Sequence, residues 1–108
     1  MKKIKFRKAI VVCLDEKAGI IEKIEGGYRF TYDSEFIKKN KPISVSLPIT
    51  KQIYESINLF PFFLGLLPEG WYLDIVIKKL KIDKNDNFGI LLATCKETIG
   101  AVTIEEWK

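Results

Sequence analysis

The sequence contains few side chains of the kinds that catalyse reactions or bind metals. None of its 108 residues is histidine, so the chain has no imidazole general base, no Ser-His-Asp triad and no histidine-ligated metal. Its two cysteines, Cys13 and Cys95, lie far apart and lack the C-x-x-C spacing. We interpret them as free thiols rather than as a disulfide or a pair of metal ligands.

The acidic pairs and the glycines also lack the context of a reactive site. The carboxylate pairs Asp83/Asp86 and Glu105/Glu106 are typical of helix caps and solvent-facing positions. No glycine begins a G-x-G-x-x-G or G-x-x-x-x-G-K-[ST] phosphate-binding pattern. Residues 87–89 read Asn-Phe-Gly, which differs from the metal-binding Asp-Phe-Gly motif by the missing carboxylate. We therefore expect no enzymatic activity, no cofactor and no metal.

The net charge of +4 is concentrated near the N-terminus. Residues 2–8 carry five of the 18 basic side chains, and the remainder, with 13 basic and 14 acidic side chains, has a net charge of −1. Basic and apolar residues alternate there, which indicates an edge strand whose lysines face solvent. A phosphate- or partner-binding stripe is the alternative interpretation. We expect no direct binding to nucleic acid.

Alternating apolar positions predict a meander in the first third of the chain. The first predicted strand spans residues 3–14, and its buried face would hold Ile4, Phe6, Ile10, Val12 and Leu14. Gly26-Gly27 predicts a tight hairpin between strands 19–25 and 28–33. In the last of these strands, alternate positions form an aromatic face of Tyr28, Phe30 and Tyr32.

The remaining segments predict mainly helices. A helical turn over 34–40, capped by Ser34, precedes a fourth short strand over 43–47, and residues 49–58 are expected to be irregular. Helices are predicted over 59–67 and 71–81, and a third begins after a cap at Asn85 or Asp86. A final strand covers 100–105. The whole chain, 1–108, is expected to be a single α+β domain: a mostly antiparallel sheet of about five strands with about three short helices.

One segment departs from ordinary composition. Residues 60–71 contain three Phe, three Leu and one Trp around the helix breakers at Pro68 and Gly70. Most of these apolar residues suit a core, but Trp71 follows a corner, where its ring either packs inward or projects outward. An outward Trp would be a strong anchor for a partner protein.

The apolar runs are much shorter than the ~20 residues that span a bilayer. The N-terminus also lacks a small-residue cleavage site. We expect a cytoplasmic protein that makes no contact with a membrane.

Several short motifs, taken together, resemble a known family. They are the runs 28–33 (YRFTYD), 43–48 (ISVSLP) and 62–70 (FFLGLLPEG), the pair Leu91-Leu92 and the run 99–102 (IGAV). Their order and spacing resemble the small N-terminal domain of HipA-type serine/threonine kinases, the toxins of bacterial toxin–antitoxin modules. The similarity extends from about residue 4 to 105. It is weakest at residues 94–97, where the family usually has a small turn containing Gly and Asp.

The resemblance implies a function. In HipA-type proteins a kinase core follows this domain, whereas this sequence stops at Lys108, so we expect a free-standing copy similar to the HipS proteins of HipBST modules. It would act as an antitoxin that binds and inhibits a HipT-like kinase, with a HipB-like helix-turn-helix protein reached through the complex. The resemblance points to the following partner-binding residues: Leu67, Pro68, Glu69, Gly70 and Trp71. The alternatives are an accessory subunit that completes or activates the kinase and a DNA-binding co-repressor component.

Overall fold

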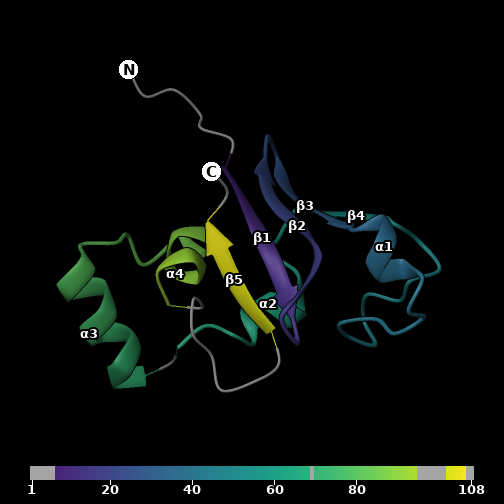
Figure 1. Cartoon of the computed structure of the whole chain (residues 1–108). Coiled ribbons are helices and arrows are strands. Elements are labelled where there is room, and N and C mark those ends of the chain that lie inside the picture. The colour runs from purple at the N-terminus through teal and green to yellow at the C-terminus, as the bar shows by residue number, and fades with distance from the viewer. Residues whose placement is uncertain (1–6, 69, 95–101, 107–108) are drawn as a thin grey trace.

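A computed structural model describes residues 7–68, 70–94 and 102–106, except for the side chains of Trp71, Tyr72 and Glu106. Over these residues the chain forms one antiparallel sheet and four helices (Figure 1). The strands are β1 (Arg7–Cys13), β2 (Glu16–Ile24), β3 (Gly27–Tyr32), β4 (Ile53–Ser56) and β5 (Val102–Glu106). The helices are α1 (Ser34–Ile37), α2 (Pro61–Leu64), α3 (Gly70–Leu80) and α4 (Asn87–Thr94). The predicted α+β class is confirmed.

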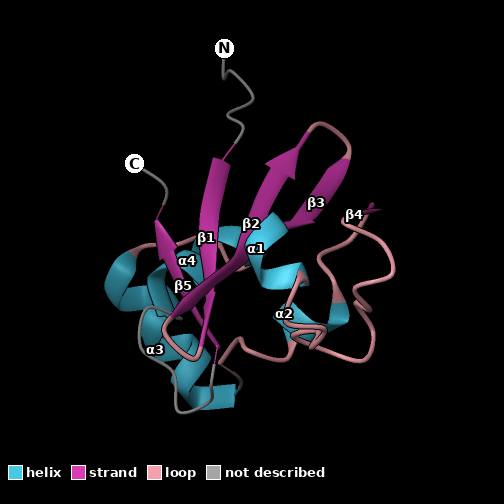
Figure 2. Cartoon of the chain, turned by 45° about the vertical axis from the view of Figure 1, so that its right-hand side comes forward, coloured by secondary structure: helices cyan, strands magenta, loops and turns pink. Residues whose placement is uncertain are grey.

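The order of the strands in the sheet is β4-β3-β2-β1-β5, so β1 lies between β2 and β5. Ala9–Cys13 of β1 pair with β5 and are central in the sheet, whereas the segment expected to be an edge strand, 2–8, lies mostly outside the described residues. Short turns join the strands of the meander (Figure 2). Leu14 and Asp15 connect β1 to β2 with φ values of 50° and 65°, and Glu25-Gly26 connects β2 to β3 with Gly26 at φ 82°. The predicted hairpin at Gly26 is confirmed, whereas Gly27 already belongs to β3.

The predicted buried face of the first strand is also wrong. Ala9 and Val11 are fully buried, whereas Ile10 and Val12 are only half-buried and Leu14 is 72% exposed. Both faces of this strand carry apolar residues, so alternation alone does not distinguish them. Packing of the helical layer decides, because the described helices cover the face of the sheet that carries Ala9 and Val11. Ile4 and Phe6 lie outside the described residues.

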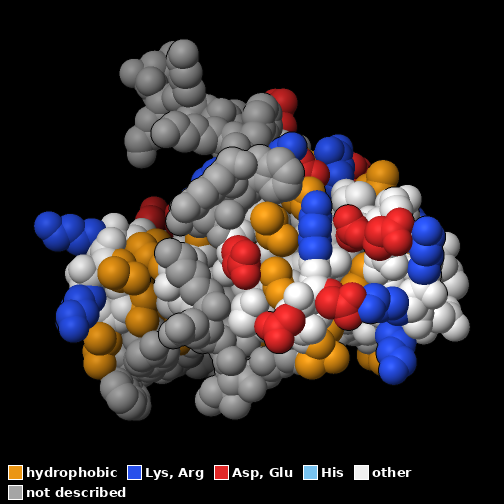
Figure 3. Space-filling view, viewed as in Figure 1, with side chains coloured by type: hydrophobic (Ala, Val, Ile, Leu, Met, Phe, Trp, Pro, Cys, Tyr) orange, Lys and Arg blue, Asp and Glu red, His pale blue; other side chains and the backbone are white. Residues whose placement is uncertain are grey.

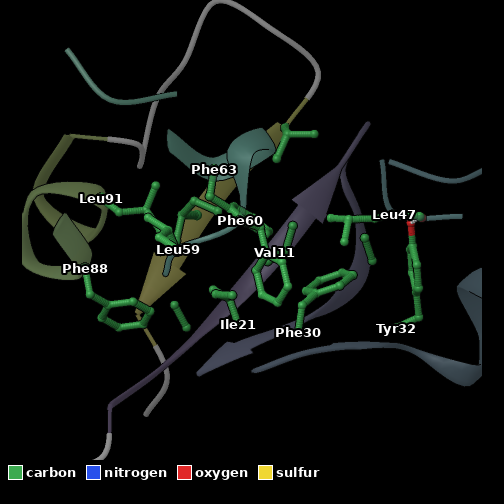
Figure 4. Packing of buried hydrophobic residues seen from close by; sticks show 14 of the residues in the cluster. Val11, Ile21, Phe30, Tyr32, Leu47, Leu59, Phe60, Phe63, Phe88 and Leu91 are labelled. Atoms are coloured by element: carbon green, nitrogen blue, oxygen red, sulfur yellow. Dashed lines mark hydrogen bonds between the residues drawn. The ribbon is translucent and has the colours of Figure 1, made fainter. Parts of the chain in front are cut away.

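The core fills the space between that face of the sheet and the short helices (Figure 4). Phe30 of β3 lies at its centre, with its ring 4.8 Å from that of Tyr32 and 5.7 Å from that of Phe63 in α2. Phe88 and Leu91 of α4 are fully buried in the same cluster. The predicted aromatic face of β3 is thus confirmed for Phe30 and Tyr32, and Tyr28 is half-buried.

The predicted strand over 43–47 is wrong. This segment is an irregular loop, because a tyrosine side chain and a local turn satisfy its backbone. The buried Tyr32 hydroxyl donates to the Leu47 carbonyl and accepts from the Ile43 N–H at 3.1 Å, and the Leu47 N–H donates to the Ser44 carbonyl at 3.0 Å. The fourth strand is instead β4, which pairs with β3 inside the segment expected to be irregular.

The helices begin near the predicted caps with one exception, but the predicted helix over 59–67 is wrong in length, because α2 covers only Pro61–Leu64. Asp33, rather than Ser34, caps α1 by accepting a hydrogen bond from the Glu35 N–H at 3.1 Å. Pro61 occupies the first turn of α2, as predicted, where its missing N–H costs nothing. Asp86 caps α4, since its carboxylate accepts from the Gly89 N–H at 3.0 Å.

Candidate partner-binding corner between α2 and α3

The segment before the corner is fixed to the sheet. Phe63 of α2 is fully buried against Phe30 and Phe60. The turn that follows α2 is closed by hydrogen bonds from the Leu66 N–H to the Phe63 carbonyl at 3.0 Å and from the Leu67 N–H to the Leu64 carbonyl at 3.2 Å. The chain therefore enters the corner from a rigid base.

The corner itself is made by the predicted breakers. Leu67 is half-buried and packs against the core, and Pro68 is half-buried. Gly70 is exposed, with φ 60° and open space where a Cβ would stand. It begins α3, and the backbone of Trp71 lies in the first turn of that helix. Glu69 and the Trp71 side chain lie outside the described residues, so whether the Trp71 ring points inward or outward stays a prediction.

Helix α3 stands off the sheet on the side of α4 and β5 (Figure 1). Of its described side chains only Val76 is buried, whereas Ile75 is 46% and Leu80 52% exposed. Positions 71 and 75 are one helical turn apart and share one side of the helix. Ile75 therefore lies exposed on the side of α3 to which position 71 belongs.

The end of α3 agrees with the predicted cationic terminus. Lys78 and Lys79 lie in its last turn, where positive charge favours the helix dipole. Lys81 follows with φ 54°, and the Ile82 N–H donates to the Ile77 carbonyl at 3.2 Å. This is the hydrogen bond of a Schellman motif, with lysine at the position that usually holds glycine.

The basic residues described near the N-terminus are ion-paired. Arg7 pairs with Asp86 at 2.6 Å, and Lys8 Nζ lies 3.9 Å from the Glu22 carboxylate. Arg29 pairs with Glu55 at 2.7 Å on the same side of the sheet as Lys8 and Glu22. Over the right-hand part of Figure 3, Lys and Arg side chains accordingly lie among acidic ones. This mixed surface does not resemble a phosphate-binding stripe.

The rest of the described surface holds little reactive chemistry. In ranges 7–68, 70–94 and 102–106 no three His, Cys, Asp or Glu side chains gather as a metal site would require. Cys13 is a free, half-buried thiol, and Cys95 lies outside these ranges. No helix in the same part of the chain is long and apolar enough to cross a membrane.

The architecture defines a class of small α+β domains, with a five-stranded antiparallel sheet covered on one face by short helices. The chain belongs to the HipA N-terminal domain family, which matches residues 9–105. It is 33% identical over 102 residues to an uncharacterized protein of Haemophilus influenzae, and the match covers 94% of each chain. Among solved structures it is similar to the N-terminal domain of HipA toxin, with a TM-score of 0.75 and 28% identity over 100% of this chain and 98% of that one. The resemblance inferred from the sequence motifs is confirmed.

Proposed function

We propose that this domain is a HipS-type antitoxin, a regulatory subunit that binds a HipT-like serine/threonine kinase and inhibits it. A HipB-like DNA-binding protein would join through the complex. The observation that carries the proposal is the corner at Leu67–Trp71. It leaves a core that is packed around Phe63, turns at a left-handed glycine and leads into a helix on which Ile75 and Leu80 are exposed.

Two features of the corner support an inhibitory contact there. Because α2 is fixed by Phe63, little conformational entropy is lost when a partner closes over the corner. A tryptophan at such a position is the residue type most enriched in interface hot spots. A kinase is inhibited when a side chain occupies its nucleotide or substrate cleft, or separates the elements that close for phosphoryl transfer.

The relatives support a regulatory chain that acts without a kinase core of its own. The match covers 94% of the Haemophilus influenzae protein, so that protein consists of little more than this domain. The matched structure is described as part of the HipA toxin, which links the family to toxin–antitoxin modules. A separate inhibitory chain makes inhibition depend on its own concentration, which proteolysis can lower.

The test is Trp71→Ala, with Val45→Ala as the control at an apolar loop residue that is 95% exposed. We expect Trp71→Ala to weaken the binding of a purified HipT-type kinase by about 30-fold, the effect of a hot spot of about 2 kcal/mol. Val45→Ala should bind like the wild type. If Trp71→Ala binds and inhibits as well as the wild type, the corner is not the inhibitory element.

A further inference from the structure

The turn between β1 and β2 combines two features that are unfavourable for the free protein. Leu14 adopts φ 50° and the following Asp15 φ 65°, the left-handed pair of a type I′ hairpin turn. Such turns favour Asn-Gly or Asp-Gly, because a side chain with Cβ is strained at positive φ. Leu14 is also 72% exposed, so burial of its side chain does not compensate for the strain. Uncompensated strain of this kind is typical of functional sites.

Leu14 forms one wall of a hollow of about 470 Å³ between this turn and α1. The hollow is lined by Cys13, Leu14, Glu16, Phe36, Lys39 and Lys41. The Phe36 ring is 94% buried and provides an apolar floor. The two lysines and one glutamate give the rim a net charge of +1, and Lys39 is ion-paired with Glu16.

The lining of the hollow suits the binding of a side chain better than it suits a chemical reaction. Burial, and secondly the charge of Glu16, raise the pKa of the Cys13 thiol, which keeps it protonated and weakly nucleophilic at neutral pH. An apolar floor and wall under a positive rim fit an apolar side chain that has a carboxylate beside it.

The position of the turn indicates which molecule would supply that side chain. In both Figure 1 and Figure 2 the turn between β1 and β2 lies at the same end of the domain as α2 and the connection to α3. A partner that covers the corner at Leu67–Trp71 therefore reaches this turn without contacting the open face of the sheet.

We propose that the β1–β2 turn is a second docking point for the kinase partner, where Leu14 and the hollow beside it hold an apolar, acid-flanked segment of the kinase. This inference rests on the proposed function and deepens it. Leu14 at positive φ lowers the stability of the free domain. It also offers the partner an apolar side chain, which an asparagine at this position would not.

The test compares Leu14→Asn with Val45→Asn, which makes a similar change at a loop residue that is 95% exposed. We expect Leu14→Asn to raise Tm by several degrees, since asparagine tolerates positive φ. The same variant should weaken binding to a purified HipT-type kinase about tenfold. A gain in stability with a loss of affinity is an outcome that a merely structural role of Leu14 does not produce. Val45→Asn should change binding less than twofold.

A second pair of variants tests the charged rim. Lys41→Glu should weaken binding to the kinase, and the loss of affinity should be larger at low salt than at high salt. Lys38→Glu, which lies outside the lining of the hollow, should not weaken binding. If Leu14→Asn binds the kinase as well as the wild type does, or if Val45→Asn weakens binding equally, the docking point is wrong. The proposed function still stands in that case, provided that the wild type binds the kinase. If the wild type itself does not bind the kinase, the proposed function is wrong and this inference fails with it.

Discussion

Arg7 and Asp86, 79 residues apart, join the first described strand to the last helix. The Arg7 guanidinium donates to both carboxylate oxygens, from Nη2 at 2.6 Å and from Nη1 at 3.3 Å. The same carboxylate caps α4 through the Gly89 N–H, and the guanidinium lies 5.1 Å from the centre of the Phe88 ring. One pair of side chains thus fixes α4 against β1.

This pair predicts a specific dependence of stability on pH. Burial alone would raise the pKa of Asp86, but hydrogen bonds from Arg7 and the Gly89 N–H, and the charges of Arg7 and Lys23, outweigh burial and hold the pKa below the ordinary value of 3.8. A lowered carboxyl pKa contributes stability that is fully present above 3.8 and is lost as pH falls through the folded-state pKa.

Urea unfolding at several pH values from 7 to about 2 tests this relationship. We expect Asp86→Asn to lose about 1 kcal/mol at pH 7, a modest figure because the pair is partly exposed. That deficit should shrink as pH falls below 3.8. Asp83→Asn, which alters an exposed carboxylate in the same connection, is the control. An Asp86→Asn deficit of constant size at all pH values would contradict the assignment.

Tyr32 predicts a second measurable effect. Its buried hydroxyl hydrogen-bonds to both ends of the 43–47 loop, so Tyr32→Phe leaves the buried Leu47 segment without a donor for its carbonyl. We expect a loss of about 1–3 kcal/mol in the free energy of unfolding, the cost of an unsatisfied buried group, and faster amide exchange in this loop.

Tyr54→Phe is the matched control for Tyr32→Phe. The Tyr54 hydroxyl donates to the Pro48 carbonyl at 2.6 Å in an exposed position, where water can replace it. We expect it to cost less than the change at Tyr32. Equal effects of the two substitutions would show that the loop does not depend on the buried hydroxyl.

Gly70 and Gly65 predict opposite consequences of the same substitution. Gly70→Ala places a Cβ on a left-handed backbone, which should cost about 1 kcal/mol and shift the start of α3. Gly65 has φ −68°, and its Cβ would make only ordinary contacts, so Gly65→Ala should be neutral or slightly stabilising. Thermal unfolding and kinase inhibition should both worsen only for Gly70→Ala. An unimpaired Gly70→Ala would mean that the corner needs no left-handed residue.

Binding of the isolated domain to DNA provides a negative prediction. Arg7 and Lys8 of the basic N-terminal segment are paired with Asp86 and Glu22, so the described part of that segment has less charge available for phosphates. We expect no gel shift of operator DNA by the domain at low salt, where phosphate contacts are strongest. A shift that weakens steeply with salt would instead favour a DNA-binding co-repressor.

The sequence predicted the parts of the fold that local chemistry specifies. The hairpin at Gly26, the proline at the start of α2 and the cap at Asp86 each depend on residues close in sequence, and all three are confirmed. The end of α2 is not, because this helix stops at Leu64, before the predicted corner. The resemblance, rather than any pattern, indicated which of its residues meet a partner.

The errors arose where distant residues decide the structure. The 43–47 loop alternates like a strand, but its N–H and carbonyl groups are satisfied by Tyr32, eleven or more residues away. Which side chains of β1 are buried depends on the helices that pack against one face of the sheet. The sequence predicts Leu14 on a strand face, because nothing in its own neighbourhood distinguishes a residue of a strained turn from one more apolar strand residue.

The most direct test of the proposed antitoxin role is a titration of the purified domain into a HipT-type kinase while autophosphorylation is followed. We predict that the rate falls to a low plateau as the domain saturates the kinase, and that Trp71→Ala shifts this curve to higher concentrations. A rate that rises with added domain would contradict inhibition and identify an activating accessory subunit, and a rate that does not change would contradict both.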